Sequence, residues 1–382
     1  MADKIILLTH EYPPIRGGAG VYCQELAMAA FELGAAIEVV APKDSILYRG
    51  PKLRELSWKG SQGWVSSIRL LFYVRKFYNQ KDKKFLLHVA DMGICKAFIR
   101  FAFLLPPQNR IMVTIHGSEL LKFTRNPIER FFFHRLLRKC EAIHVLSKFN
   151  YQKCSEFYPS SVPKLKLIPG APSRVVDNCP QERQDKMDPE MIQILCVGRI
   201  HPRKGQALLL KAASMLPIAL QSKIQIIFIG PVKDKRYQQG ILSLSDKFNG
   251  RIQIMGDISE SELRDFYENS DIFCLTPITL KDSVEGFGFV YLEASAYGLP
   301  IIATRVGGVE DAVLDLKTGL LSDPEKLDEL KQNLLSLIKS KKLRKEMGAK
   351  GQKWSAQHTW AKIAIEIYPD IKAHLQKQDA NG

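Results

Sequence analysis

Short, nearly continuous apolar runs alternate with helical stretches along this 382-residue chain, and that alternation constrains its fold most strongly. The runs cover residues 4–9, 37–41, 85–89, 111–115 and 142–146, and then 192–197, 224–229, 252–255, 272–275 and 301–304. Strands that are apolar on both faces, with helices between them, are typical of parallel sheets covered on both sides. We therefore expect an α/β protein with doubly wound sheets.

The alternation lapses once, between residues 171 and 190, where prolines and polar residues are typical of a linker. The length also favours more than one domain, at roughly 150 residues per domain. The sequence thus predicts a Rossmann-like domain over 1–175, a second over 190–352 and a C-terminal helical segment over 353–382. Ligands of such sheets bind beyond the carboxyl ends of the strands, so we expect a site in a cleft between the domains.

The hydrophobic share of 46% and the charged share of 25% are those of a folded globular protein and exclude a disordered or collagen-like chain. The net charge of +15 is uneven: residues 1–180 carry +13 and residues 181–382 carry +2. A basic first half predicts an anionic partner, which can be a phospholipid surface, a nucleic acid or a phosphorylated substrate.

Two stretches of the basic half, residues 66–85 and 125–140, interleave aromatic and basic side chains. This pattern is typical of helices that lie on an anionic membrane, and helices that cover a sheet can show it too. The seven cysteines form no C-x-x-C pair, and the chain has neither a signal-peptide pattern nor an apolar run of spanning length. We expect a cytoplasmic protein that can attach peripherally to the inner face of a membrane.

A candidate phosphate site follows the apolar run 192–197. Gly198 allows a tight turn, Arg199 and Lys204 place two cations in a short loop, and a helix is predicted to begin near Gly205. Cations beside the positive end of a helix bind phosphate well. A solvated basic loop would have the same sequence, and we expect both cations to be accessible to solvent.

The segment EGFGFVYLE, residues 285–293, is the second candidate. Gly286, Phe287 and Gly288 can form a turn whose backbone amides bind phosphate, with a helix beginning at about Phe289. The carboxylates of Glu285 and Glu293 would then bind sugar hydroxyls. The competing interpretation is a pair of glutamates on a solvated helix face.

Taken in order, these segments resemble the family 4 glycosyltransferases of GT-B fold. The resemblance covers nearly the whole chain and rests on GG at 17–18, HG at 116–117, GR-x4-KG at 198–205, E-x7-E at 285–293, GLPIIATRVGGVED at 298–311 and TGLL at 318–321. Within that family, RKGQ and EGFGFVYLEA are most similar to mannosyltransferases that act on phosphatidylinositol-type lipids. The implied fold has two Rossmann-like domains facing across a cleft and a C-terminal helix that crosses back to the first domain.

The resemblance implies that the second domain binds the donor. Arg199 and Lys204 would hold its diphosphate, Glu285 its sugar and Glu293 its ribose hydroxyls. The remaining donor contacts would be the backbone amides of Gly286, Phe287 and Gly288, and Asp257 near the base.

In the first domain, which would bind the acceptor, the resemblance implies that His116 faces the transferred sugar, although a buried structural histidine is the alternative. Gly17 and Gly18 would approach the donor phosphate, and Arg16 would face the acceptor. His116, Glu285, Arg199 and Lys204 are the implied catalytic residues.

The implied reaction retains the anomeric configuration while it moves a hexose from a nucleotide diphosphate sugar, GDP-mannose or a UDP-hexose, to a lipid-linked or glycan acceptor. Metal-dependent glycosyltransferases hold a divalent ion with a D-x-D pair, which this chain lacks. We therefore expect Arg199 and Lys204 to stabilise the leaving diphosphate with no metal or other cofactor. The expected partners are the nucleotide sugar, the acceptor and an anionic membrane surface.

Two other functional classes remain open. A nucleotide-sugar epimerase of the same fold would need acid and base carboxylates or histidines in the cleft, and the match of Arg199, Lys204 and E-x7-E to the glycosyltransferase pattern argues against it. A non-catalytic binder of membrane or nucleic acid would explain the charge but not the donor-type residues, and no RNA- or DNA-reading motif occurs. A dehydrogenase is excluded because no strand is followed by G-x-G-x-x-G.

Overall fold

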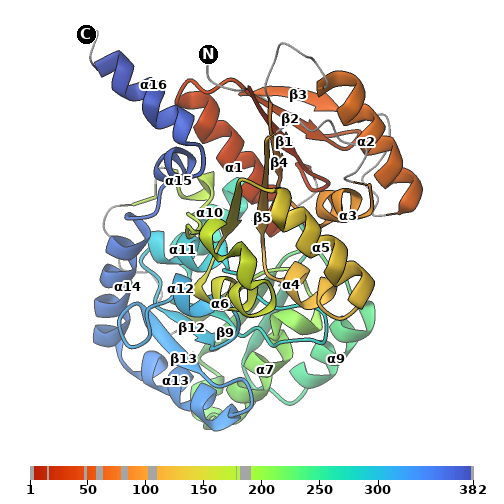
Figure 1. The fold of residues 1–382 in the computed structure, drawn as a ribbon. Helices are drawn as coiled ribbons and strands as arrows, with labels where there is room; N and C mark the ends of the chain where they lie inside the picture. Colours follow the sequence, from red (N-terminus) through yellow and green to blue (C-terminus); the bar gives the residue numbers. More distant parts are fainter. Residues whose placement is uncertain are drawn as a thin grey trace. The chain divides into compact units, whose positions relative to one another are not determined.

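The computed structural model describes residues 4–14, 17–46, 50–56, 63–78, 85–101, 110–177, 179–180 and 191–379. The chain divides into two compact units, and each contains one parallel sheet with helices on both faces (Figure 1). Unit 1 consists of Met1–Gly170 together with Thr359–Gly382, and unit 2 consists of Ala171–His358. The predicted α/β class and the doubly wound sheets are confirmed.

Unit 1 has a seven-stranded sheet in the order β3-β2-β1-β4-β5-β6-β7. All of its neighbouring strands pair in parallel. The strands are β1 (Lys4–Leu8), β2 (Ile37–Ala41), β3 (Lys52–Glu55), β4 (Phe85–Val89), β5 (Arg110–Ile115), β6 (Ala142–Val145) and β7 (Leu165–Leu167).

Helices cover both faces of this sheet. On one face α2, α3 and α5 share an apolar core with alternate strand residues. On the other face α15 packs against α1, so the C-terminal helices return to unit 1 as predicted. The helices are α1 (Gly18–Glu32), α2 (Trp64–Tyr78), α3 (Met92–Phe101), α4 (Ser118–Phe123), α5 (Pro127–Lys139), α6 (Lys148–Phe157), the 3₁₀ helix η2 (Pro159–Lys164), α15 (Trp360–Ile367) and α16 (Pro369–Asp379).

Unit 2 has a six-stranded parallel sheet in the order β10-β9-β8-β11-β12-β13. Its strands are β8 (Ile192–Val197), β9 (Ile224–Ile229), β10 (Arg251–Met255), β11 (Ile272–Leu275), β12 (Ile301–Thr304) and β13 (Gly319–Ser322). Its helices are η3 (Arg174–Val176), η4 (Pro202–Lys204), α7 (Gln206–Ser214), α8 (Ile218–Gln221), α9 (Lys235–Ser245), α10 (Glu260–Asn269), α11 (Phe289–Ala296), α12 (Val309–Ala312), α13 (Leu327–Lys339) and α14 (Lys341–Ser355).

Strand order fixes where each sheet can bind a ligand. In unit 2 the chain runs outward from β8 to β10 and then returns to place β11 on the other side of β8. In such sheets, ligands bind beyond the carboxyl ends of the two strands where the order reverses. For unit 2 this point lies after β8 and β11, and for unit 1 it lies after β1 and β4.

The C-terminal boundary differs from the prediction. Trp354 belongs to α14, and its indole Nε1 donates to the Ala312 carbonyl oxygen at 3.0 Å within unit 2. The next helix begins only at Trp360, where the Thr359 side chain accepts a hydrogen bond from the Lys362 amide at 3.4 Å. The segment that returns to unit 1 thus begins at Thr359 rather than at residue 353, because a capping threonine interrupts the apolar spacing.

The face of the unit 1 sheet that α1 covers carries a buried polar network. His88 forms two hydrogen bonds, from Nδ1 with the Tyr368 hydroxyl at 2.6 Å and from Nε2 with the Thr114 hydroxyl at 2.7 Å. His144 Nδ1 forms a hydrogen bond with the Tyr22 hydroxyl at 2.9 Å. Burial lowers the pKa of His88 to about 3 and that of His144 to about 4. Both imidazoles are therefore neutral at physiological pH, and the network joins β4, β6, α1 and the C-terminal segment without a charge.

Candidate functional site

A glycine brings the loop after β8 against the chain that follows β11. Gly205 adopts a φ of +70° between η4 and α7. A Cβ atom at this position would lie 1.7 Å from the carbonyl oxygen of Thr276, so only glycine fits. The Thr276 hydroxyl donates to the Gly205 carbonyl at 2.8 Å. These contacts hold two loops together at the switch point of the sheet.

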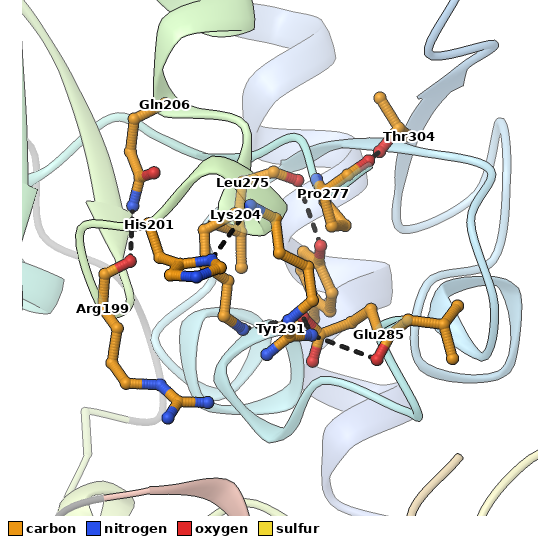
Figure 2. Close-up of polar contacts among 11 residues, drawn as sticks. Arg199, His201, Lys204, Gln206, Leu275, Pro277, Glu285, Tyr291 and Thr304 are labelled. Carbon is orange, nitrogen blue, oxygen red and sulfur yellow. Dashed lines mark hydrogen bonds and ion pairs between the residues drawn. The ribbon is translucent and has the colours of Figure 1, made fainter. Parts of the chain in front are cut away.

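The two loops place a carboxylate between two cations. Glu285 Oε2 lies 2.7 Å from Lys204 Nζ and 2.9 Å from Arg203 Nη1 (Figure 2). The Arg203 Nη1 also donates to the Val284 carbonyl at 3.1 Å. The Glu285 side chain is 10% exposed and those of Lys204 and Arg203 are 12% exposed. Lys204 is therefore largely buried, which corrects the expectation that it is accessible to solvent.

The ion cluster remains charged despite its burial. Burial alone would raise the pKa of Glu285, but Lys204, Arg203 and Arg199 together hold it at about 2. Burial lowers the pKa of Lys204, and the Glu285 carboxylate opposes that effect. The carboxylate is ionised at neutral pH, and the cations outnumber it, so the cluster as a whole is positive.

Backbone contacts fix the segment that carries Glu285. The Gly308 amide donates to the Glu285 carbonyl at 2.9 Å, and the Ile278 amide donates to the Arg203 carbonyl at 2.9 Å. The Thr304 hydroxyl donates to the Pro277 carbonyl, and the Tyr291 hydroxyl donates to the Leu275 carbonyl at 3.0 Å (Figure 2). The loop after β11 is thus built as a rigid frame for one carboxylate.

Arg199 stands apart from this cluster. Its carbonyl oxygen accepts a hydrogen bond from Gln206 Nε2 at 3.0 Å, while its side chain extends to one side of the Lys204–Glu285 pair (Figure 2). Among the residues that the structure describes, none forms a hydrogen bond or an ion pair with the Arg199 guanidinium. The side chain is half-buried, so its charge is available to an anionic ligand.

The glycine-rich turn has the predicted form. Gly288, with a φ of +93°, precedes α11, which begins at Phe289. A Cβ atom on Gly288 would lie 2.5 Å from the Tyr291 ring, so the turn requires glycine. Phe287 is buried, and Gly286 lies between it and Glu285.

Glu293 lies one turn inside α11 and is buried. Its Oε1 accepts from the Ser173 hydroxyl at 2.7 Å, and its Oε2 accepts from the Tyr267 hydroxyl at 2.9 Å. Burial raises the pKa of Glu293, and the two donors oppose that effect. The structure therefore excludes a solvated helix face for this residue and gives it polar partners of its own, separate from those of Glu285.

Asp257 follows β10 at the same end of the sheet and is exposed. It comes two strands away from β8 in the sheet order, so the structure does not bring it to Lys204 and Glu285.

The candidate residues of unit 1 lie near its own switch point. Gly17 precedes α1, where a Cβ atom would lie 2.5 Å from Glu11 Oε2, and Gly18 is the first residue of that helix. His116 follows β5, and its Nε2 donates to the Ala90 carbonyl at 2.9 Å. In the neutral ring this bond leaves Nδ1 as an acceptor. Arg16 lies outside the described residues.

Three polar residues of unit 2 escaped the sequence analysis. Arg203 shares Glu285 with Lys204, and Ser173 and Tyr267 share Glu293. The adjacent basic pair at 203–204 was the available signal for Arg203. Nothing in the sequence connects residues 173 and 267 to residue 293, because the contacts join separate elements. Within the described ranges, no group of three or more His, Cys, Asp or Glu side chains could hold a metal ion.

Comparison with known proteins gives a consistent result. Residues 180–354 match the family model described as glycosyl transferases group 1. A GDP-mannose-dependent alpha-(1-6)-phosphatidylinositol monomannoside mannosyltransferase of Mycobacterium tuberculosis is 23% identical, covering 96% of this chain and 97% of its own length. The enzyme of the same description from Mycolicibacterium smegmatis is 26% identical and covers 92% of this chain and 93% of its own.

The fold also matches solved structures. A sucrose-phosphate synthase from Thermosynechococcus elongatus superposes with a TM-score of 0.76 at 17% identity, and the match covers 100% of both chains. At this identity the likeness establishes the architecture, which consists of two α/β units that each contain a parallel sheet. It does not identify the substrates.

Proposed function

We propose that the chain is a glycosyltransferase that transfers a hexose from a nucleotide diphosphate sugar to a lipid-linked or glycan acceptor, since residues 180–354 match the model of glycosyl transferases group 1 and the fold is that of solved glycosyltransferases. The proposed reaction retains the anomeric configuration and needs no metal ion. The observation that carries the proposal is the positive cluster of Arg203, Lys204 and Glu285 beside the unpaired Arg199 guanidinium.

The charge of this cluster suits the leaving group. Breaking the bond between the sugar and the diphosphate leaves negative charge on the phosphate oxygens. Arg199 and Lys204 would bind those oxygens, and Glu285 and Arg203 hold the Lys204 ammonium in place at 2.7 Å from the carboxylate. Fixed cations that need no rearrangement stabilise such a transition state strongly. We propose that they do so in place of a divalent ion.

The donor would extend over the carboxyl end of the unit 2 sheet. The backbone amides of Gly286, Phe287 and Gly288 are the proposed phosphate or sugar contacts, and Glu293 the proposed ribose acceptor. Asp257 would lie nearest the base. Of the two candidate donors, GDP-mannose is favoured because the relatives that cover nearly the whole chain are named for it.

The acceptor would bind to unit 1. Gly17 and Gly18 permit close approach at its switch point, with Arg16 alongside as the proposed acceptor contact. His116 would face the transferred sugar, and its free Nδ1 can accept a hydrogen bond from a hydroxyl. The names of the relatives favour a phosphatidylinositol-type acceptor.

An anionic membrane surface is the proposed place of action. Helix α5 buries Phe133, Leu136 and Leu137 and exposes Ile128 by 67% and Phe131 by 61%. The exposed Arg130 of the same helix lines a pocket of about 350 Å³, together with Pro127, Phe131, His134, Phe157 and Tyr158. A helix with one core face and one basic, aromatic face fits the interface of an anionic bilayer. No helix among the described residues is long and apolar enough to cross a membrane.

The proposal is tested by the reaction itself. We expect purified protein, incubated with GDP-mannose and phosphatidylinositol vesicles, to give a mannosylated lipid and GDP. We expect the NMR spectrum of the product to show the α-anomeric configuration of the donor. A β-linked product would contradict retention, and the absence of transfer from GDP-mannose and from UDP-hexoses to any lipid or glycan acceptor would contradict the function.

A further inference from the structure

Glu293 is a buried carboxylate without a cation. Its residue is 5% exposed, and no Lys, Arg or His side chain among the described residues forms an ion pair with it. Two hydroxyls instead satisfy its two oxygens, one from Tyr267 at 2.9 Å and one from Ser173 at 2.7 Å. A buried carboxylate that depends on neutral donors loses much of its stabilisation when one of them is removed.

The geometry points to a role for these donors, and we propose that Tyr267 and Ser173 are positioning residues that orient the Glu293 carboxylate for a ribose hydroxyl of the donor nucleotide. This inference rests on the proposed function, in which Glu293 is the ribose acceptor. A carboxylate has about four acceptor sites, so the two hydroxyls and the Ser173 backbone amide, which also donates to Glu293, leave one site for a ribose hydroxyl.

Tyr267 is the better placed of the two. It lies on α10, is fully buried, and stacks on Tyr297 with ring centroids 5.3 Å apart and an interplanar angle of 8°. Burial raises the pKa of Tyr267 well above its usual value, so its hydroxyl always carries a proton to donate. The ring cannot rotate away without unstacking, and its hydroxyl therefore fixes the direction of Glu293 Oε2.

Ser173 is held to the same unit by its neighbours. The Tyr297 hydroxyl donates to the Val175 carbonyl at 2.6 Å. Arg264 Nε donates to the same carbonyl at 3.2 Å, and Arg264 Nη2 donates to the Arg174 carbonyl at 3.3 Å. The segment from 173 to 176 is thus attached to α10 and α11, and this attachment presents the Ser173 hydroxyl to Glu293 Oε1.

The test removes the tyrosine hydroxyl and the ribose hydroxyls separately. Affinities of wild type and Tyr267→Phe are measured by calorimetry for GDP and for 2′,3′-dideoxy-GDP, with the UDP pair run in parallel. We expect Tyr267→Phe to weaken GDP binding by about 10-fold, or about 1.4 kcal/mol. Binding of the dideoxy nucleotide should weaken by less than ~2-fold, because the ribose hydroxyl that donates to Glu293 is already gone.

Tyr78→Phe is the matched control. It also removes a buried phenol hydroxyl that donates to a carboxylate, but that carboxylate is Glu38 of unit 1, at 2.7 Å, and not Glu293. We expect this variant to leave the ratio of the affinity for GDP to the affinity for dideoxy-GDP unchanged. Ser173→Ala keeps the aromatic stack intact and should reduce the ratio in the same direction as Tyr267→Phe, which supplies a second variant if Tyr267→Phe folds poorly.

The outcomes separate the inference from the proposed function. Equal losses for both nucleotides in Tyr267→Phe and Ser173→Ala, or no loss for either nucleotide, would overturn the positioning role while wild-type ribose discrimination stands. Wild-type protein that binds both nucleotides equally would remove the ribose role of Glu293, and the inference with it. Wild-type protein that binds no nucleoside diphosphate would overturn the proposed function as well.

Discussion

At the residue scale, the site depends on one carboxylate that forms ion pairs with two cations. Lys204 and Glu285 are 81 positions apart in the sequence, yet their side chains meet at 2.7 Å. A lysine this well buried needs a counter-ion, and a fully paired cation would attract a phosphate only weakly. Arg203 meets both requirements, because it also forms an ion pair with Glu285. Lys204 therefore has a counter-ion, and the three side chains together still carry a net positive charge.

The contribution of Arg203 can be measured directly. We expect Arg203→Met to lower kcat/KM for glycosyl transfer by about 10- to 100-fold, because a charged hydrogen bond contributes roughly 1.5–3 kcal/mol. Arg203→Lys should restore only part of this loss, since one ammonium replaces the guanidinium that contacts both Glu285 and the Val284 carbonyl. Steady-state kinetics on both variants provide the measurement.

Arg251→Met is the control for that comparison. Arg251 is exposed and begins β10, at the opposite end of the same parallel sheet. It should keep wild-type kinetics. Wild-type kcat/KM in Arg203→Met, or an equal loss in Arg251→Met, would show that Arg203 has no specific part in the reaction.

The sequence revealed part of this site and missed the rest for a physical reason. Glycines at 205 and 288 marked turns, and both turns are where the sequence placed them. The contacts of Glu293 with Ser173 and Tyr267 depend on how α10, α11 and the segment after Gly170 pack together. Neither spacing nor composition carries that information. The sequence therefore singled out Glu293 as a candidate site residue but could not identify its hydrogen-bond partners.

At the scale of elements, the strands with three or more apolar residues were predictable, and the three strands with fewer apolar residues were not. The ten predicted strands are all present, with ends that differ by a few residues at most. The three missed strands are β3 with the sequence KLRE, β7 with LKL and β13 with GLLS. Each ends a sheet, where one side of the strand has no neighbour and fewer apolar residues are needed.

The buried histidines of the unit 1 sheet predict a dependence of stability on pH. The folded-state pKa values of His88 and His144, about 3 and about 4, lie below the value of about 6.5 for an unfolded chain. Below pH 6.5 the unfolded chain binds protons that the folded chain does not, so stability falls as pH falls. As pH falls, each histidine should lower the free energy of unfolding by about 1.4 kcal/mol per pH unit.

Urea denaturation between pH 6.5 and 5 measures this slope. We expect His88→Gln combined with His144→Gln to flatten the slope. The control is His134→Gln, which replaces a histidine of α5 that lies outside this network and is hydrogen-bonded to Ser160 at 2.7 Å. An unchanged slope in the double variant would mean that other groups cause the loss of stability.

At the scale of the whole molecule, the uneven charge predicts where the protein binds. Residues 1–180 carry +13, and both α2 and α5 expose aromatic side chains beside cations. Each cation near an anionic surface contributes about 1 kcal/mol, and salt screens this attraction. We expect the protein to float with phosphatidylinositol vesicles at low salt, less at high salt, and not with phosphatidylcholine vesicles.

A paired substitution locates the membrane contact. Phe131→Ser removes an exposed ring from α5, and Ile218→Ser removes an equally exposed side chain from α8 of unit 2. The first should reduce vesicle binding and the second should not. Binding that is independent of salt and of both substitutions would remove the membrane from the proposed function.

The central claim is that fixed cations of unit 2, rather than a metal ion, bind the diphosphate of the donor. Calorimetric titration of GDP in EDTA tests it most directly, with guanosine as the ligand that lacks phosphates. We predict that wild-type protein binds GDP under these conditions. Arg199→Ala and Lys204→Met should each weaken GDP binding by about 10- to 100-fold and leave guanosine binding unchanged. GDP binding that appears only when a divalent ion is added, or that both variants retain in full, would contradict the claim.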